Sequence, residues 1–321
     1  MAEGPVRGAG APAGRAAINC ALVVAAGVLA ALMGLAACSG PRGGGDGTAA
    51  RAAGETDLAN GAAVFRAGGC ATCHALPGAD ARGVPRLGGG RRLDTRFGTF
   101  RVPNISPDTA TGIGTWTLAE FDAAMRRGRR PDGAHYYPAF PYTSYARMTG
   151  ADIRDLWAYL RGLPPVPNVV AGHALRAPFR SRRALGVWKR LYLRPAPVVS
   201  VADAGPQVSR GRYLVEAIGH CGACHTPRDA LGGPDYRRWL AGSTKLASGP
   251  VPNITSGAPG IAGRSVEEIA QGLLPAATHA AAGDYGFAME AVRRNLAHLS
   301  GSDRRAIAAY LKAVPARPGE G

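Results

Sequence analysis

Two short motifs of the form Cys-x-x-Cys-His carry the side chains with the clearest chemistry in this chain. They occupy residues 70–74 and 221–225. Two thiols at this spacing can reach the two vinyl groups of one haem and form thioethers, and the His that follows then ligates the iron. We therefore predict two covalently bound haems c, attached at Cys70, Cys73, Cys221 and Cys224, with His74 and His225 as iron ligands.

A zinc site or a redox dithiol is the alternative use of such motifs. A structural zinc ion needs a compact cluster of four ligands, whereas Cys221 follows Cys70 by 151 residues. The two other cysteines, Cys20 and Cys38, lie in or just after an apolar N-terminal stretch, so the cysteines do not predict a disulfide scaffold. The paired motifs favour covalent haem attachment.

The sequence around the motifs occurs twice with nearly constant spacing. The pair Tyr159–Leu160 recurs as Tyr310–Leu311 at an offset of 151 residues, and Asn104 recurs as Asn253 at an offset of 149. Three landmarks in the same order indicate a duplicated unit.

Apolar residues at helical spacing predict an all-α fold with an opening, a short and a closing helix in each half. Thr149 and Ser300, each followed three residues later by Asp, are expected to cap the closing helices. The Gly- and Pro-rich segments between motif and closing helix would wrap around a covalently fixed planar cofactor. The other expected helices cover residues 58–67, 118–127, 209–217 and 266–273.

These landmarks divide the folded part of the chain into domains of residues 55–165 and 205–316, joined by an irregular basic linker of residues 166–204. Between Asp155 and Asp203 the sequence has eight Arg or Lys residues and no acidic residue. Two roles fit this linker: a connector packed across both domains, with its Arg stems covering apolar surface, or a docking strip for a partner.

The N-terminus has the order of a secretory signal. Arg7 and Arg15 precede an apolar run over residues 18–37, which ends in Leu35–Ala36–Ala37–Cys38. This ending resembles a bacterial lipobox and predicts a signal peptide over residues 1–38 with a lipid on Cys38; an uncleaved transmembrane helix is the alternative. Both alternatives predict a membrane-anchored, periplasm-facing protein, with residues 39–54 as a flexible tether.

The charge of the chain limits its partners. The formal net charge is +16, and the isoelectric point is about 10.3. Such a charge fits an ordinary basic surface as well as docking to an acidic partner or an anionic membrane. The basic residues are spread along the chain without a nucleic-acid-binding motif, so we predict no nucleic-acid partner.

The motifs and the segments around them resemble the dihaem branch of the bacterial cytochrome c family. This branch includes the cytochrome subunits of periplasmic alcohol, aldehyde and gluconate dehydrogenases, which usually carry three haem motifs where this chain has two. The resemblance implies two tandem class I cytochrome c domains and an electron carrier without catalysis of its own. It would pass single electrons from a periplasmic dehydrogenase to a downstream cytochrome or oxidase of the respiratory chain. The segments that carry the resemblance are Cys70–His74, Val102–Ile105, Thr111–Trp116, Tyr137–Tyr142 and Cys221–Pro227.

The second axial ligands are expected to be Met289 and Met148. Met289 precedes the closing helix of the second half, where a class I cytochrome c has its ligand loop. In the first half the usual ligand place falls near Phe140, which cannot bind iron, and Met148 is the nearest methionine. His135 or an open iron remains an alternative there, whereas Met125 lies inside a predicted helix and is expected in the core.

The rival function is that of a dihaem peroxidase. Such an enzyme needs an iron with an open or displaceable site and an acid–base group beside it. The first half, with its less certain ligand, is where that iron would lie.

Overall fold

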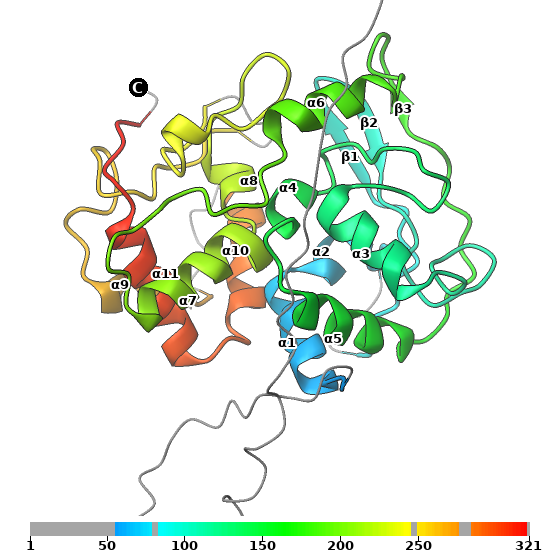
Figure 1. Ribbon diagram of the computed structural model, residues 1–321, viewed down its shortest axis with the longest axis horizontal. Helices are drawn as coiled ribbons and strands as arrows, with labels where there is room; N and C mark the ends of the chain where they lie inside the picture. The colour runs from blue at the N-terminus through cyan, green and yellow to red at the C-terminus, as the bar shows by residue number, and fades with distance from the viewer. Residues whose placement is uncertain (1–54, 79–82, 245–248, 276–283, 320–321) are drawn as a thin grey trace, which may run out of the picture. The chain divides into compact units, whose positions relative to one another are not determined.

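The computed structural model describes residues 55–78, 83–244, 249–275 and 284–319, which belong to one compact unit (Figure 1). The predicted signal peptide and lipobox of residues 1–38 and the tether of residues 39–54 lie outside the described residues. Across the described ranges, every helix is too short or too polar to cross a bilayer.

Short helices joined by long connections make up most of the structure. In the first half the elements are α1 (Leu58–Ala67), α2 (Cys70–His74), β1 (Arg92–Thr95), β2 (Gly98–Arg101), α3 (Leu118–Arg127), α4 (Tyr142–Tyr145) and α5 (Gly150–Arg161). The connecting segment contributes β3 (Ala174–Leu175) and α6 (Ala184–Tyr192). The second half consists of α7 (Pro206–Tyr213), the π-helical turn η1 (Leu214–Ile218), α8 (Gly222–His225), the 3₁₀ turn η2 (Tyr236–Arg238), α9 (Val266–Gly272), α10 (Asp284–Leu296) and α11 (Gly301–Ala313).

The opening and closing helices of each half pack together through a glycine. A Cβ on Gly61 in α1 would overlap the carbonyl oxygen of Asp155 in α5, and a Cβ on Gly211 in α7 would overlap the carbonyl oxygen of Ala306 in α11. The two glycines are 150 residues apart, so the duplicated sequence builds the same close helix contact twice. Small residues are needed where two helix backbones come this close.

An asparagine closes each half in the same way. The Asn104 side-chain amide donates to the Val166 carbonyl at 2.7 Å, and the Asn253 amide donates to the Arg317 carbonyl at 2.8 Å. Each bond ties the segment after the haem motif to the chain that follows the closing helix. Asn104 and Asn253 stand in the sequence Pro–Asn–Ile in both halves, and this repeated landmark therefore has a structural cause.

The expected capping box of the first closing helix forms only in part. Thr149 accepts a bond from the Asp152 backbone N–H at 3.1 Å, as a cap should. The Asp152 carboxylate instead accepts from the Asn60 amide at 2.7 Å and from the Tyr213 hydroxyl. An Asp side chain is shorter than the Glu or Gln of a capping box, and here it joins helices from both halves.

The prediction of an all-α fold with an irregular linker is wrong in two respects. The strands β1, β2 and β3 form a small antiparallel sheet in that order, and β3 comes from the linker. The linker also contains helix α6. The strands pair because the chain turns at Gly98, which has a φ of +115°. The side chains of Phe100, Tyr137 and Leu175 form a separate apolar cluster that supports the sheet.

Helix α6 is held by both halves of the chain. The Lys189 ammonium donates to the Arg127 and Gly128 carbonyls at the end of α3, each at 2.6 Å. The Trp188 indole N–H donates to the Leu231 carbonyl in the second half at 3.0 Å. The linker therefore acts as a connector packed across the two halves, which was one of the two roles expected for it.

The main apolar core continues across the two halves. Val64 and Phe65 of α1 belong to the same cluster of buried side chains as Leu214 and Ile218 of η1. The division into domains of residues 55–165 and 205–316 therefore stays a prediction from the repeat.

The glycine contacts lead to a test of the helix packing. Gly61→Ala and Gly211→Ala should each lower the free energy of unfolding by about 1–3 kcal/mol, because the new methyl overlaps a backbone carbonyl. Gly150→Ala is the matched control, because a Cβ at this helical glycine meets no heavy atom within 4 Å. Urea unfolding should leave the control unchanged or slightly more stable; equal stability of all three variants would contradict the close packing.

Candidate haem sites

The first Cys-x-x-Cys-His motif forms helix α2, which places both thiols and the imidazole on one short turn. Gly69 precedes it in the left-handed region, with a φ of +62°, a conformation that glycine adopts at low cost. The His74 Nδ1 lies 2.9 Å from the Pro103 carbonyl oxygen. Since a carbonyl can only accept, Nδ1 carries the proton and the lone pair of Nε2 is left for a metal.

The second motif repeats this geometry. Cys221 precedes α8, which contains Cys224 and His225, and the His225 Nδ1 lies 2.8 Å from the Pro252 carbonyl oxygen. Pro103 and Pro252 occupy the same place in the repeated Pro–Asn–Ile landmark. Both halves thus orient an imidazole through the same backbone acceptor.

The charge states of the motif side chains fit haem attachment better than a thiolate site. Burial raises the pKa of the Cys70 and Cys221 thiols to about 12, so both are protonated at neutral pH, whereas reactive redox thiols have lowered pKa values. Burial lowers the pKa of His74 to about 4 and also lowers that of His225. Both imidazoles are therefore neutral and able to donate a lone pair to iron.

These residues fit haem c in number and chemistry. Each motif offers two unpaired thiols and one neutral imidazole whose Nδ1 is already hydrogen-bonded to a Pro carbonyl. Among the described residues, no three His, Cys, Asp or Glu side chains gather as a metal-binding cluster.

Met148 lies beside the first motif. It is 3% exposed and lines a small cavity together with Cys70, Tyr145 and Met125. Met125, which the sequence analysis assigns to the core, is buried in the main apolar cluster and also lines this cavity. His135 lies elsewhere, against Arg129 and α6, and Met148 as the ligand of the first haem stays a prediction.

Met289 does not lie in a loop, so the expectation of a distal loop in the second half is wrong. It lies in α10, half-buried, and packs against the main core. From Met289 to Leu296 the sequence has no glycine or proline, and Met289, Val292 and Leu296 follow helical spacing. This pattern continues the helix through the methionine. Its role as a ligand remains a prediction.

The segments around the two motifs are in contact. The His220 Nε2 lies 3.2 Å from the Gly68 carbonyl oxygen, and the Asn295 amide donates to the Thr72 hydroxyl at 3.0 Å.

His220 is a site residue that sequence reasoning missed. It precedes Cys221 as Gly69 precedes Cys70, and it has the same left-handed backbone, with a φ of +40°. A non-glycine residue in this region carries a conformational cost that is often retained for function. The replacement of a glycine by a histidine at an equivalent position of the repeat was the available signal.

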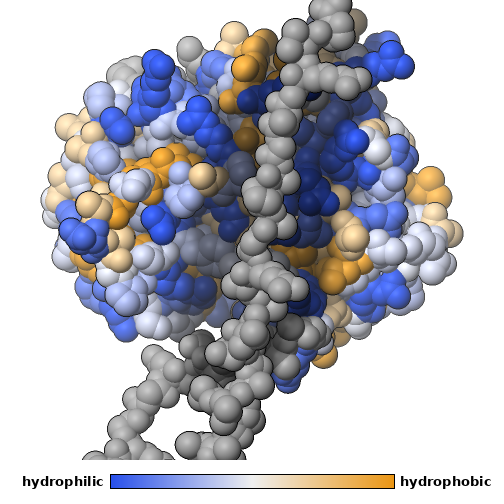
Figure 2. All heavy atoms as spheres, in the orientation of Figure 1, coloured by the Kyte–Doolittle hydropathy of each residue, from blue (hydrophilic) through white to orange (hydrophobic). Residues whose placement is uncertain are grey.

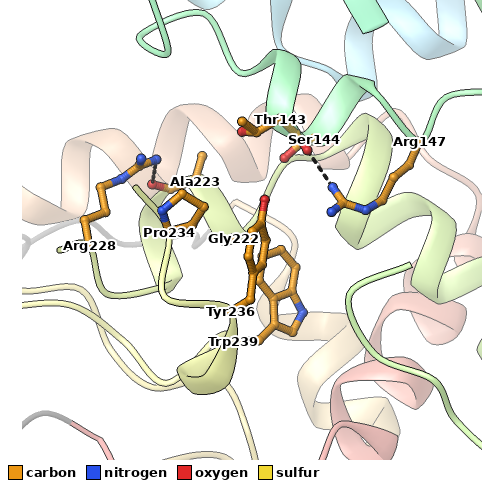
Figure 3. Close-up of a pocket in the computed structure, with 9 residues that line it drawn as sticks. All are labelled: Thr143, Ser144, Arg147, Gly222, Ala223, Arg228, Pro234, Tyr236 and Trp239. Atoms are coloured by element: carbon orange, nitrogen blue, oxygen red, sulfur yellow. Dashed lines mark hydrogen bonds between the residues drawn. The ribbon is translucent and has the colours of Figure 1, made fainter. Parts of the chain in front are cut away.

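A buried ion pair lies on the other side of the second motif. Arg147, next to Met148, lies 3.6 Å from Glu216, and both side chains are more than nine-tenths buried. Glu216 also accepts from the Tyr310 hydroxyl at 2.5 Å and from the Val198 N–H at 2.7 Å. Arg147 lines a small cavity with Gly222, Ala223, Tyr236, Trp239 and other residues (Figure 3). The sequence signal was an acidic residue inside the apolar run that opens the second half.

Comparison with known proteins agrees with this geometry. The family model described as cytochrome c matches residues 58–164. A diheme cytochrome c-type protein of Cereibacter sphaeroides is 48% identical over 265 residues, which are 81% of this chain and 86% of that protein. This chain belongs to the cytochrome c family. As a member, it carries covalently bound haem and serves electron transport.

Two further relatives of this cytochrome are parts of larger systems. The fructose dehydrogenase cytochrome subunit of Gluconobacter japonicus is 38% identical over 78% of this chain and 51% of its own length. The gluconate 2-dehydrogenase cytochrome c subunit of Pantoea cypripedii is 36% identical over 84% of this chain and 64% of its own length. The cytochrome therefore spans about half to two thirds of these dehydrogenase subunits. A peroxidase is not favoured by these relatives.

The cavity beside Cys70 provides a test of the first distal ligand. Met148→Ala should remove part of the weak long-wavelength absorbance of Met-ligated ferric haem and lower one reduction potential, because a thioether ligand raises the potential. Met125→Leu is the matched control at the same cavity and should leave both unchanged. If the control loses the band and Met148→Ala keeps it, Met125 is the ligand.

Proposed function

We propose that this cytochrome is a dihaem electron carrier that passes single electrons between a periplasmic dehydrogenase and a downstream acceptor of the respiratory chain. The observation that supports it best is the repeated bond from a motif His to a Pro carbonyl, at 2.9 Å for His74 and 2.8 Å for His225, in two motifs whose preceding residues are in contact. One haem would be attached at Cys70 and Cys73, and the other at Cys221 and Cys224.

The haem iron supplies a one-electron couple between its ferric and ferrous states. The protein residues would orient the haem and shield it from water. His74 and His225 are the proposed proximal ligands, and their Nδ1–H bonds fix the imidazole plane and increase the basicity of Nε2. Met148 and Met289 are the proposed distal ligands. The buried apolar side chains around Met148 keep water from that side, which raises the potential of a haem.

The contact between the segments that precede the two motifs supports transfer from one haem to the other within the chain. The two environments differ, because Met148 is fully buried while Met289 is half-buried on a helix. Two different environments imply two different potentials, and a difference in potential gives the electron a preferred direction.

Partners of the dehydrogenase class are supported by the relatives that are named as subunits of fructose and gluconate dehydrogenases. In this proposal the chain has no catalysis of its own, and the downstream acceptor is a cytochrome or oxidase. The lipobox-like ending at Cys38 supports a lipoprotein held on the periplasmic side of the membrane. Residues 55–165 and 205–316 would form the two cytochrome c domains.

The haem count tests the proposal. The pyridine haemochrome should report about two haems per chain, and denatured protein should keep its haem stain because thioethers survive unfolding. The double variant Cys221→Ala/Cys224→Ala should keep one haem, and Cys70→Ala/Cys73→Ala should keep the other. A wild-type count of one would overturn the dihaem proposal.

His220 provides a test of the contact between the haems. His220→Gly recreates the residue that the first half has at Gly69 and keeps the left-handed backbone without strain, but it removes the bond to the Gly68 carbonyl. We expect both haems to be retained and electron transfer between them to slow, as followed by flash photolysis of the half-reduced protein. His298→Gly, at a histidine before the second closing helix, is the control. An unchanged rate in His220→Gly would show that this side chain does not couple the haems.

A further inference from the structure

An exposed apolar patch lies where α6 meets the second half. Val187 and Leu191, one helical turn apart on α6, are 61% and 54% exposed, and Leu231 on the adjoining loop is 60% exposed. We call these three residues the α6 patch. Figure 2 shows apolar atoms gathered at the upper edge of this face, close to α6, with strongly hydrophilic side chains on either side. Large aliphatic side chains that gather in the open mark interaction sites more often than single exposed ones do.

The patch is preformed. The Leu231 carbonyl accepts from the Trp188 indole at 3.0 Å, and the Tyr192 hydroxyl donates to the Asp229 carboxylate at 2.5 Å. The loop that carries Leu231 is thus bonded to two residues of α6. A surface that is already ordered loses little conformational entropy when a partner binds.

Aromatic side chains extend the surface beyond the loop. The Phe97 ring lies against Gly232 and contacts the Phe179 ring at a centroid distance of 4.8 Å. The Arg96 guanidinium lies over the Phe97 ring and donates to the Asp229 carbonyl at 2.9 Å. Aromatic and Arg side chains of this kind are enriched where protein interfaces carry their binding energy.

The rim of the patch is basic. Arg183, Arg190 and Arg194 are exposed on and beside α6, and residues 156–202 contain no acidic residue. The nearby Asp229, whose carboxylate also accepts from the Leu231 and Gly233 N–H groups, keeps its negative charge, but the three exposed arginines outnumber it. The exposed field around the patch is therefore positive.

The loop that carries Leu231 is connected to the second haem motif through Arg228. The Arg228 guanidinium donates to the Ala223 carbonyl, inside the motif, at 3.0 Å and to the Gly232 carbonyl at 2.8 Å. Cys224 of the same motif is exposed. A molecule bound on the patch would lie close to the attachment point of the second haem.

We propose that the α6 patch is the docking surface for a redox protein with an acidic rim and an apolar centre. The proposal rests on the proposed electron-carrier function. A second copy of this chain does not fit, because the Arg rims would face each other and repel. A lipid surface fits less well, because binding of a helix to a bilayer scales with buried apolar area, and only two large aliphatic side chains of α6 are exposed.

An acidic blue-copper protein is a suitable probe. One electron leaves a ferrous haem, which becomes ferric, and reduces Cu(II) to Cu(I) without proton transfer. The second-order rate, followed by stopped flow, should fall as salt rises, because opposite charges attract less when screened. The double variant Val187→Asp/Leu191→Asp should slow this rate about tenfold or more, and Arg190→Gln should weaken its dependence on salt.

Val169→Asp is the matched control, since Val169 is 84% exposed and lies outside the patch. The control should react like the wild type with the copper protein, and all variants should react alike with the small uncharged oxidant benzoquinone. Equal copper-protein rates in the double variant and the control, or a wild-type rate that does not fall with salt, would overturn the docking surface. Loss of binding to phosphatidylglycerol vesicles with an unchanged copper-protein rate would assign the patch to lipid and also overturn it. A wild-type protein that benzoquinone cannot oxidise would instead refute the electron-carrier function.

Discussion

The hydrogen bond from a motif imidazole to a proline carbonyl is the interaction on which the rest of this structure depends. His74 bonds to Pro103, and His225 bonds to Pro252. The bond fixes which nitrogen keeps its proton, and it requires the segment after each motif to return to the motif helix. The asparagine that follows each proline then ties that segment to the chain beyond the closing helix. The packing of each half thus follows from the need to hold one ring in place.

The duplicated halves differ where they meet. A histidine replaces a glycine before the second motif and reaches the Gly68 carbonyl, and α10 occupies a region where the first half has only the short α4. Identical halves would give two haems in the same environment and no preferred direction of transfer. The positions at which the two halves differ are therefore the features that suit a carrier with one electron donor and one electron acceptor.

The linker and the buried Arg147–Glu216 pair make the two halves depend on each other. A buried ion pair that loses one partner leaves an uncompensated charge, which is strongly destabilising. Helix α6 is bonded to α3 on one side and to the loop of Leu231 on the other. Loosening one half would thus disturb the surface that the other half presents to a partner.

The sequence by itself determined the chemistry and the repeat of this protein. Covalent attachment needs two thiols and a histidine at fixed local spacing. The helices 58–67 and 118–127 follow from local periodicity and caps. The haem motifs and these helices therefore depend only on residues that are neighbours in the sequence. Only the tertiary structure decided what meets across long separations. It turned the linker into a strand and a helix, and it brought His220 to Gly68 and Arg147 to Glu216. Such contacts join residues up to 223 positions apart, and their energy depends on burial and geometry, which the order of residues along the chain does not specify.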